Sequence, residues 1–403
     1  MKFVVQYTTQ SERTPLYTDN YRYNITGNDY SQKPNQLTLV GLRNSFVQGE
    51  HFSEIYRDHH RGFLSYGFNP SEYFIRSYPD NPSIMSAYGF MLGVNPNLVD
   101  GLALIEEKDQ IEPLRDAHVD DARRALYLDK PAKGSKPVYV HSGNSDGFFF
   151  KDISETYPGL KKDFENNIKA ASEDFQKAEG SKLFYKLSAL MNVPMELLDF
   201  SNIAMYLDDY ISAYSNSKEV APFTFDPDTL DQVSKYYTYL MKYGLLRDRA
   251  LNKVLAHPFL YSLLRELLFK AQDKQELDRW EGPCVSSKVS LAFGNRLTYL
   301  AAMRVLGIDK DVVYNPGWGD QLTIELLTDN NKPFVRIFNN NDLVILFSKN
   351  GNIPLDDFKS FICSKLYYGN MDAVEDGFED YHNFADVKGG NCDALTEITP
   401  LFG

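Results

Sequence analysis

The chain of 403 residues is poor in cysteine, with only Cys284, Cys363 and Cys392. Three scattered cysteines are too few for the disulfide framework of a small secreted protein, and their spacing does not suit a zinc site. Their odd number favours a reducing compartment, in which thiols stay free. The sequence also shows no basic and apolar leader ahead of its first apolar segment. We therefore expect an intracellular protein that is not secreted.

Two further absences concern membranes and nucleic acids. The sequence has no apolar run close to the roughly 20 residues that a membrane-spanning helix needs. It has no segment rich in lysine and arginine, and its formal net charge is −13. Phosphate backbones and anionic lipids repel such a surface. We expect no transmembrane segment and no nucleic-acid partner, and we interpret the charge as a source of solubility.

Several common motifs of catalysis and metal binding are absent as well. The sequence contains no Gly-x-Ser-x-Gly nucleophile motif and no Gly-x-x-x-x-Gly-Lys-Ser/Thr phosphate loop. His59 and His60 are adjacent, whereas two ligands on one helical face would stand four residues apart. This pair predicts the solvated end of a helix. We expect no metal and no cofactor.

What the sequence does have is a hydrophobic content of 43%, which is ample for the core of a large globular protein. Its first part alternates between two kinds of pattern. Apolar strands are predicted at 3–5 and 72–77, and a helix is predicted to open at Thr38 as its N-cap. Strand and helix in alternation predict an α/β sheet with parallel members.

The middle and final parts differ in pattern. Segment 159–274 has a helical period almost throughout, with an interruption predicted at Pro258. A buried strand follows at 289–293, and two alternating segments around the turn 328–332 predict a hairpin. We therefore divide the chain into three parts. These are the first part of an α/β core (1–150), a helical cap insertion (151–275), and the second part of the core with a C-terminal tail (276–403).

The segment 9–15, at the end of the first strand, carries the most informative motif. It resembles the Arg-His-Gly-x-Arg-x-Pro signature of the histidine acid phosphatases, and its second half, with Arg13, is intact. Its first half is changed: Thr9 replaces the arginine, Gln10 the nucleophilic histidine and Ser11 the glycine. A carboxamide has no lone-pair nitrogen that can attack phosphorus. The resemblance therefore implies that the first chemical step is lost.

Two further segments resemble motifs of the same family. Segment 77–83 is similar to Ser-Thr-Asp-x-x-Arg-Thr, but Pro82 stands where the phosphate-binding arginine belongs. Asn295 and Arg296 stand at the positions of the His-Asp dipeptide, whose aspartate protonates the leaving alcohol. A guanidinium does not release its proton near neutral pH, so Arg296 cannot take that role. Of the six side chains that carry the family's chemistry, only Arg13 is retained.

The resemblance covers about residues 1–360. It implies an α/β fold with a phosphoglycerate-mutase-like, histidine-phosphatase core sheet, which is flanked by helices and carries an inserted all-helical cap. Since secreted members of the family usually contain disulfides, it also leaves open a pairing of Cys363 with Cys392. With nucleophile and general acid replaced, we expect a catalytically inactive homologue.

Three functions remain for such a chain. The first is a structural or scaffolding subunit of a larger intracellular protein complex, with the mitochondrion favoured over the cytoplasm or cytoskeleton. The second is a binding module in which Arg13 and Arg296 hold a phosphate-bearing small molecule in the relict pocket. Against it, Arg296 is expected to pair with Glu12 or another acid and to fill the cavity. The third is a hydrolase with relocated catalytic residues.

Overall fold

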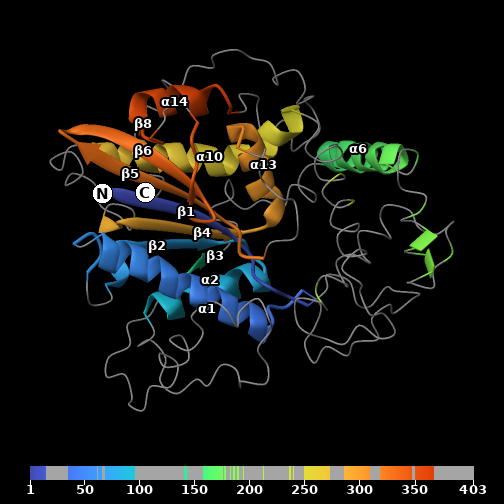
Figure 1. The fold of residues 1–403 in the computed structure, drawn as a ribbon, viewed down its shortest axis with the longest axis horizontal. Coiled ribbons are helices and arrows are strands. Elements are labelled where there is room, and N and C mark those ends of the chain that lie inside the picture. The colour runs from blue at the N-terminus through green and yellow to red at the C-terminus, as the bar shows by residue number, and fades with distance from the viewer. Residues whose placement is uncertain are drawn as a thin grey trace.

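A central sheet with helices on both faces organises the computed structural model (Figure 1). The structure describes residues 1–14, 35–60, 62–65, 69–95, 140–142, 158–175, 249–272, 286–308, 318–346 and 350–366, with single positions between 177 and 239. None of the helices within these ranges is long and apolar enough to cross a bilayer. The predicted cap segment 151–275 lies largely outside the described residues, and the three-part division stays a prediction.

The sheet has the strand order β3-β2-β4-β1-β5-β6-β7, with β8 paired to β6. Its strands are β1 (Phe3–Thr9), β2 (Tyr73–Ser77), β3 (His141–Ser142), β4 (Val289–Gly294), β5 (Gln321–Asp329), β6 (Lys332–Asn339), β7 (Asp342–Leu343) and β8 (Ile353–Pro354). The pairings among β1 to β4 are parallel, and those of β5 with β1 and β6 are antiparallel. The predicted hairpin is thus the β5–β6 pair, and the predicted parallel members are present.

The two faces of this sheet are covered by helices from different parts of the chain (Figure 1). The helices are α1 (Leu39–Ser53), α2 (Asn81–Val94), α6 (Pro158–Phe175), α10 (Arg249–Ala271), α13 (Arg296–Leu306) and α14 (Leu355–Cys363), with the short π-helix η1 (Glu54–His59) and 3₁₀-helix η2 (Pro70–Glu72). The N-terminal helices α1 and α2 lie on one face. The C-terminal helices α10, α13 and α14 lie on the other.

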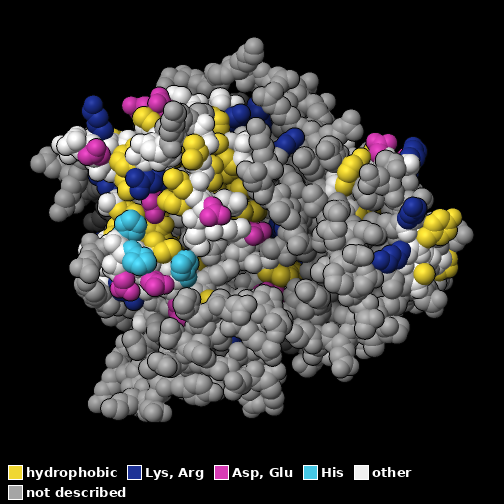
Figure 2. All heavy atoms as spheres, viewed as in Figure 1, with side chains coloured by type: hydrophobic (Ala, Val, Ile, Leu, Met, Phe, Trp, Pro, Cys, Tyr) yellow, Lys and Arg dark blue, Asp and Glu magenta, His cyan; other side chains and the backbone are white. Residues whose placement is uncertain are grey.

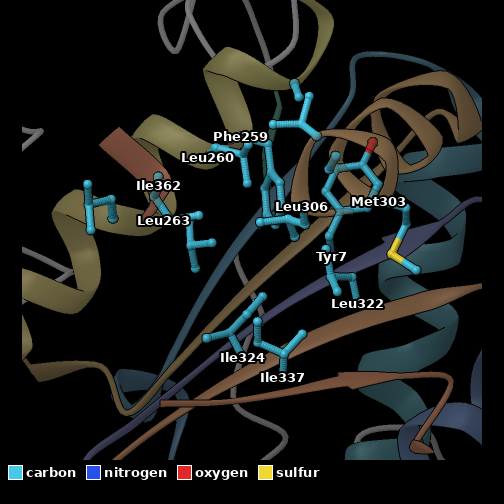
Figure 3. Packing of buried hydrophobic residues seen from close by; sticks show 14 of the residues in the cluster. Tyr7, Phe259, Leu260, Leu263, Met303, Leu306, Leu322, Ile324, Ile337 and Ile362 are labelled. Carbon is cyan, nitrogen blue, oxygen red and sulfur yellow. The ribbon is translucent and has the colours of Figure 1, made fainter. Parts of the chain in front are cut away.

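Alternation along β1 explains the two layers, because successive side chains of a strand point to opposite faces. Phe3, Val5 and Tyr7 belong to the core beneath α10 and α13, whereas Val4 packs with residues of α1 and α2. Figure 3 shows the first of these cores, in which side chains of α10, α13 and α14 meet those of β1, β5 and β6. Both faces of the sheet are therefore buried, as the apolar strands require.

Helix α10 passes through Pro258 without a break, so the predicted interruption is wrong. Proline removes one backbone hydrogen bond and costs about 3 kcal/mol in a helix interior. Here the cost is offset by burial, since Leu255, Leu260 and Leu263 on either side of Pro258 are at most 1% exposed. Although α10 falls inside the segment predicted as a cap, it packs on the core sheet.

One buried ion pair fastens α10 to the sheet. Arg76 of β2 donates to the carboxylate of Glu266, and both side chains are at most 5% exposed. The guanidinium also donates to Ser262 Oγ at 2.9 Å and to Ser290 Oγ at 3.2 Å, and it lies over the ring of Phe74. Since several donors and acceptors are satisfied together, the pair is held in one arrangement.

Cys363, at the end of α14, is disulfide-bonded. Cys284 and Cys392 both lie outside the described residues, so the predicted pairing with Cys392 stays a prediction. Disulfides persist in oxidising compartments and are rare where glutathione keeps thiols reduced. A bonded Cys363 differs from the free thiols that the odd cysteine count predicted.

Candidate site at the carboxyl ends of the parallel strands

The three motif segments meet at one edge of the sheet. Strands β1, β4 and β2 are neighbours and run parallel, with Thr9 beside Gly294 and Ser77 beside Phe293. The carboxyl ends of parallel strands lie at the same edge, where α/β proteins commonly bind ligands. Each motif lies where one of these strands ends. Because the strands are parallel neighbours, Gln10, Pro82 and Asn295 come to a common region.

The backbone on both sides of Gln10 is tied to neighbouring segments. Thr9 N–H donates to Asp320 O at 2.9 Å, and Gln10 N–H donates to Gly294 O at 3.0 Å. Gln10 O in turn accepts from Gly319 N–H at 3.2 Å. The side-chain oxygen Oε1 of Gln10 is buried and has no hydrogen-bond partner among the described residues. A neutral amide therefore stands at the position that the resemblance aligns with the nucleophilic histidine.

Ser11 and Glu12 join this loop to the first two helices. Ser11 N–H donates to Ser86 Oγ of α2 at 3.0 Å, and Ser45 Oγ of α1 lies 2.8 Å from Ser11 Oγ. The carboxyl group of Glu12 accepts a hydrogen bond from Asn44 of α1. Burial raises the pKa of Glu12 to about 7, and the bond from Asn44 opposes the shift. Glu12 thus connects this loop to α1.

Arg13, which the resemblance aligns with an arginine of the phosphatase motif, is 5% exposed. Its Nη1 donates to Thr14 O at 2.9 Å, and its guanidinium lies 5.2 Å from the ring centroid of Trp318. A cation over the face of tryptophan is a favourable arrangement. Its backbone forms a bridge with Leu37, just before α1. Arg13 is therefore held by the scaffold through both its backbone and its side chain.

Pro82 stands in the first turn of α2, a position that suits proline because the N–H groups there have no helical partner. The helix is capped by Asp80, whose Oδ1 accepts from Ser83 N–H at 2.9 Å. Asn81 Oδ1 accepts from Leu37 N–H at 2.9 Å and so connects this turn to the start of α1. The residues around Pro82 therefore form a normally capped helix N-terminus.

Asn295 has a capping role at the end of β4. Its Oδ1 accepts from Thr298 N–H at 2.9 Å and caps α13, while its carbonyl accepts from the hydroxyl of Tyr7 at 2.8 Å. Glycine at 294 allows this approach, because a Cβ there would lie 2.2 Å from the Tyr7 hydroxyl. The side chain of Asn295 therefore caps the N-terminus of α13.

Arg296 lies beside Asp320, with Nη2 and Oδ2 3.6 Å apart. Burial raises the pKa of Asp320, while Arg296 and a hydrogen bond from Asn340 oppose the shift. Arg296 Nε is buried without a hydrogen-bond partner among the described residues. The neighbouring acid is Asp320, whereas Glu12, the acid that the sequence analysis named first, accepts from Asn44.

One short segment, 318–320, contacts both arginines of the expected pocket. Trp318 lies against Arg13 and Asp320 lies against Arg296. Neither Trp318 nor Asp320 was given a role from the sequence, because no local pattern relates them to the two arginines. As for chemistry, the amide of Gln10 is no nucleophile, and the ring of Pro82 has no N–H to donate to a phosphate. The guanidinium of Arg296 offers no acid near neutral pH.

Similarity to known proteins is evident in structure alone. No protein-family model and no curated protein sequence matches the chain. Among solved structures, the apo phytase of Hafnia alvei is similar with a TM-score of 0.62 and 13% identity, over 91% of this chain and 97% of that chain. The phytase of Citrobacter braakii gives a TM-score of 0.61 at 12% identity, over 90% and 97% of the two chains.

A third similar structure is the multiple inositol polyphosphate phosphatase of Bifidobacterium longum in complex with inositol hexasulfate. Its TM-score is 0.56 at 10% identity, over 90% of this chain and 91% of that chain. At such low identity the likeness concerns the fold. The expected fold class, a mixed α/β core with a helix-flanked sheet of the histidine-phosphatase type, is thereby confirmed.

Proposed function

We propose that this chain is a pseudo-phosphatase that acts as a structural or scaffolding subunit of a protein complex. The observation that carries the proposal is that residues at the substituted positions make contacts that stabilise the fold. Asn295 caps a helix, Pro82 occupies a helix first turn, and Arg296 lies beside Asp320. A site whose former catalytic positions serve the fold supports a role that depends on the surface of the protein.

The fold itself is compatible with either an active or an inactive protein, because fold does not determine function. The argument for inactivity is chemical. Removal of an activated nucleophile alone typically costs several orders of magnitude in rate, and members of a catalytic set act as a unit. Here the nucleophile and the acid are both replaced, by Gln10 and Arg296.

The proposal predicts that the purified full chain hydrolyses no phosphomonoester. Neither p-nitrophenyl phosphate nor myo-inositol hexakisphosphate should release phosphate above a blank over a pH series from acid to neutral. The variant Gln10→His is expected to be equally inactive, because a restored imidazole still lacks the acid and the phosphate ligands. Turnover by the wild type that Arg296→Gln abolishes would contradict the proposal and support a hydrolase with relocated residues.

The scaffolding part needs its own measurement. Gentle purification from the native source, followed by mass spectrometry of what co-migrates with the chain, is expected to recover it with defined protein partners. Recovery as a free monomer at native concentration counts against a subunit role. The compartment is part of this proposal too: we expect an intracellular location, with the mitochondrion favoured over the cytoplasm or cytoskeleton. The disulfide at Cys363 supports an oxidising space within it.

The second candidate function is the binding of a phosphate-bearing small molecule at the same edge. The observation in its favour is Arg296, whose Nε and Nη2 have no hydrogen-bond partner among the described residues and whose contact with Asp320 is as long as 3.6 Å. The solved phytase of Hafnia alvei in complex with myo-inositol hexakis sulphate shows that the fold can hold a polyanion. An anion with several oxygens would provide the missing acceptors.

This candidate predicts that Arg296→Gln weakens the binding of myo-inositol hexakisphosphate by about ten-fold or more, as measured by titration calorimetry. The matched control is Arg304→Gln, because Arg304 is an exposed arginine near the other end of the same helix, α13. Equal affinity of Arg296→Gln and the wild type would exclude the relict pocket as the binding site. Loss in both variants would indicate diffuse attraction to surface charge.

A further inference from the structure

A second polar region lies outside the candidate site. A cavity of about 130 Å³ opens between the end of α1, the π-helix η1 and the strands β1, β5 and β6. Figure 2 shows histidine side chains gathered over this end of α1, beside a hydrophobic area. His51 and His60 line the cavity. None of the motifs of the candidate site contributes to it.

The helix that forms one wall has an unusual end. Helix α1 continues directly into η1, in which His60 N–H donates to Ile55 O at 3.0 Å, five residues back. Such π-helical turns are rare and frequently occur at functional sites. Tyr56 of this turn is 4% exposed and stacks on His60, with 5.9 Å between ring centroids. The wall therefore combines an aromatic stack with a π-helical turn.

The floor of the cavity carries two opposite charges. Glu325 of β5 and Arg336 of β6 are directly opposite each other in the antiparallel pair, and both line the cavity. Neighbours of opposite charge at such positions normally attract each other. Here they have separate partners. Glu325 accepts from the Tyr56 hydroxyl at 2.9 Å, and Arg336 Nε donates to Asn352 Oδ1 at 2.7 Å.

Glu325 is the more unusual of the two, since it is only 3% exposed. Burial raises its pKa, and four neighbours oppose the shift: the Tyr56 hydroxyl, His60, Arg336 and the N-terminal ammonium. Among the described residues, Glu325 accepts its hydrogen bond from a neutral hydroxyl, and a buried carboxylate gains stability when a ligand or water also solvates it. The adjacent cavity is the place from which such solvation can come.

We propose that this cavity binds a small zwitterion, a molecule that carries one ammonium and one carboxylate group, such as an α-amino acid. The ammonium group lies against Glu325 and the carboxylate against Arg336. In this arrangement each protein charge keeps its present partner and gains a charged one, which is the stronger kind of hydrogen bond. Phe52 and Phe338, which also line the cavity, provide apolar contacts for a short side chain.

The proposal is tested by ligand-observed NMR on the full chain with glycine, L-alanine and L-leucine as probes. Propionate and ethylamine serve as matched probes with a single charge. We expect at least one amino acid to bind about ten-fold or more tightly than either single-charge probe. If no amino acid binds, or if propionate binds equally well, the proposal is overturned. Equal binding of propionate would indicate a simple anion site.

Variants locate the binding. Glu325→Gln keeps an acceptor for Tyr56 but loses the charge, and Arg336→Gln loses the guanidinium. Each should weaken binding of the best amino-acid probe by about ten-fold or more. The control is Lys332→Gln, an exposed cation at the start of the same strand, which should bind as the wild type does. Unchanged affinity in both cavity variants overturns the proposal.

A measurement on the unaltered protein guards against variants that fail to fold. The imidazole proton signals of the wild type are followed by NMR as the amino-acid probe is added. Signals assigned to His51 and His60 should shift with saturation at the same probe concentration as the binding signal, because both side chains line the cavity. Imidazole signals that stay in place while the probe binds would place the probe elsewhere and overturn the proposal.

Discussion

Replacement of Glu266 by alanine is expected to lower the free energy of unfolding by about 3–5 kcal/mol. The change removes one charge of a buried ion pair, because Arg76, which donates to Glu266, is itself only 2% exposed. Ser262 and Ser290 still accept from the guanidinium, but neither carries a compensating charge. The loss is measured from urea unfolding followed by circular dichroism, with the slope of the transition checked for two-state behaviour.

Two further variants give this prediction its controls. Glu54→Ala removes an exposed acid at the end of α1 and should change stability by no more than about 0.5 kcal/mol. The double variant Arg76→Met/Glu266→Leu removes both charges and should recover most of the loss, because the cost arises from removing one charge of a buried pair while the other charge stays. A single variant as stable as Glu54→Ala would show that Arg76 and Glu266 are accessible to water.

This ion pair also marks what the sequence could not reveal about α10. The pattern of apolar residues predicted a helix there, because helical periodicity is a local property. Arg76 and Glu266 are 190 positions apart, and nothing local to either indicates the other. The passage of the helix through Pro258 was missed for a related reason. Propensity is overridden when packing on both sides buries enough apolar surface.

Features that depend on neighbouring residues were predicted well. Thr38 accepts from Gly41 N–H at 3.1 Å and starts α1, as its position before an apolar period indicated. The hairpin between β5 and β6 turns at Asn330 and Asn331, both with positive φ, a conformation that asparagine tolerates better than most residues. In each case the side chain that shapes the backbone is within a few positions of its partner.

The candidate sites divide in the same way. Resemblance of short motifs placed Gln10, Pro82 and Asn295, and the parallel strands bring these segments to one edge. The neighbour of Arg296 was not predictable, since Asp320 reaches it from a loop before β5. The sequence indicated a helix end at His60 but not the cavity beside it. That cavity depends on a π-helical register and on strands more than 260 positions away.

The contact between α1 and α2 leads to the second large effect. The backbones approach each other at two glycines, reciprocally: a Cβ on Gly49 would lie 1.9 Å from Phe90 O, and a Cβ on Gly93 would lie 1.9 Å from Phe46 O. Neither carbonyl can move without displacing its helix. Gly49→Ala and Gly93→Ala are therefore each expected to lower the free energy of unfolding by about 3 kcal/mol, the upper end of what overpacking costs. Thermal and urea unfolding measure the change.

The sign of the change makes this prediction decisive. In a helix without such a contact, alanine in place of glycine raises stability by roughly 0.5–1 kcal/mol, because glycine loses more conformational freedom on folding. Gly89→Ala of α2 is the graded control, since its nearest neighbours would lie at 2.9–3.0 Å and two of the three are side-chain atoms. It should destabilise less than either other variant. A stabilising Gly49→Ala would mean that α1 and α2 are further apart. The double variant Gly49→Ala/Gly93→Ala should lower the free energy of unfolding by less than the sum of the two single losses, because both substitutions act on one interface.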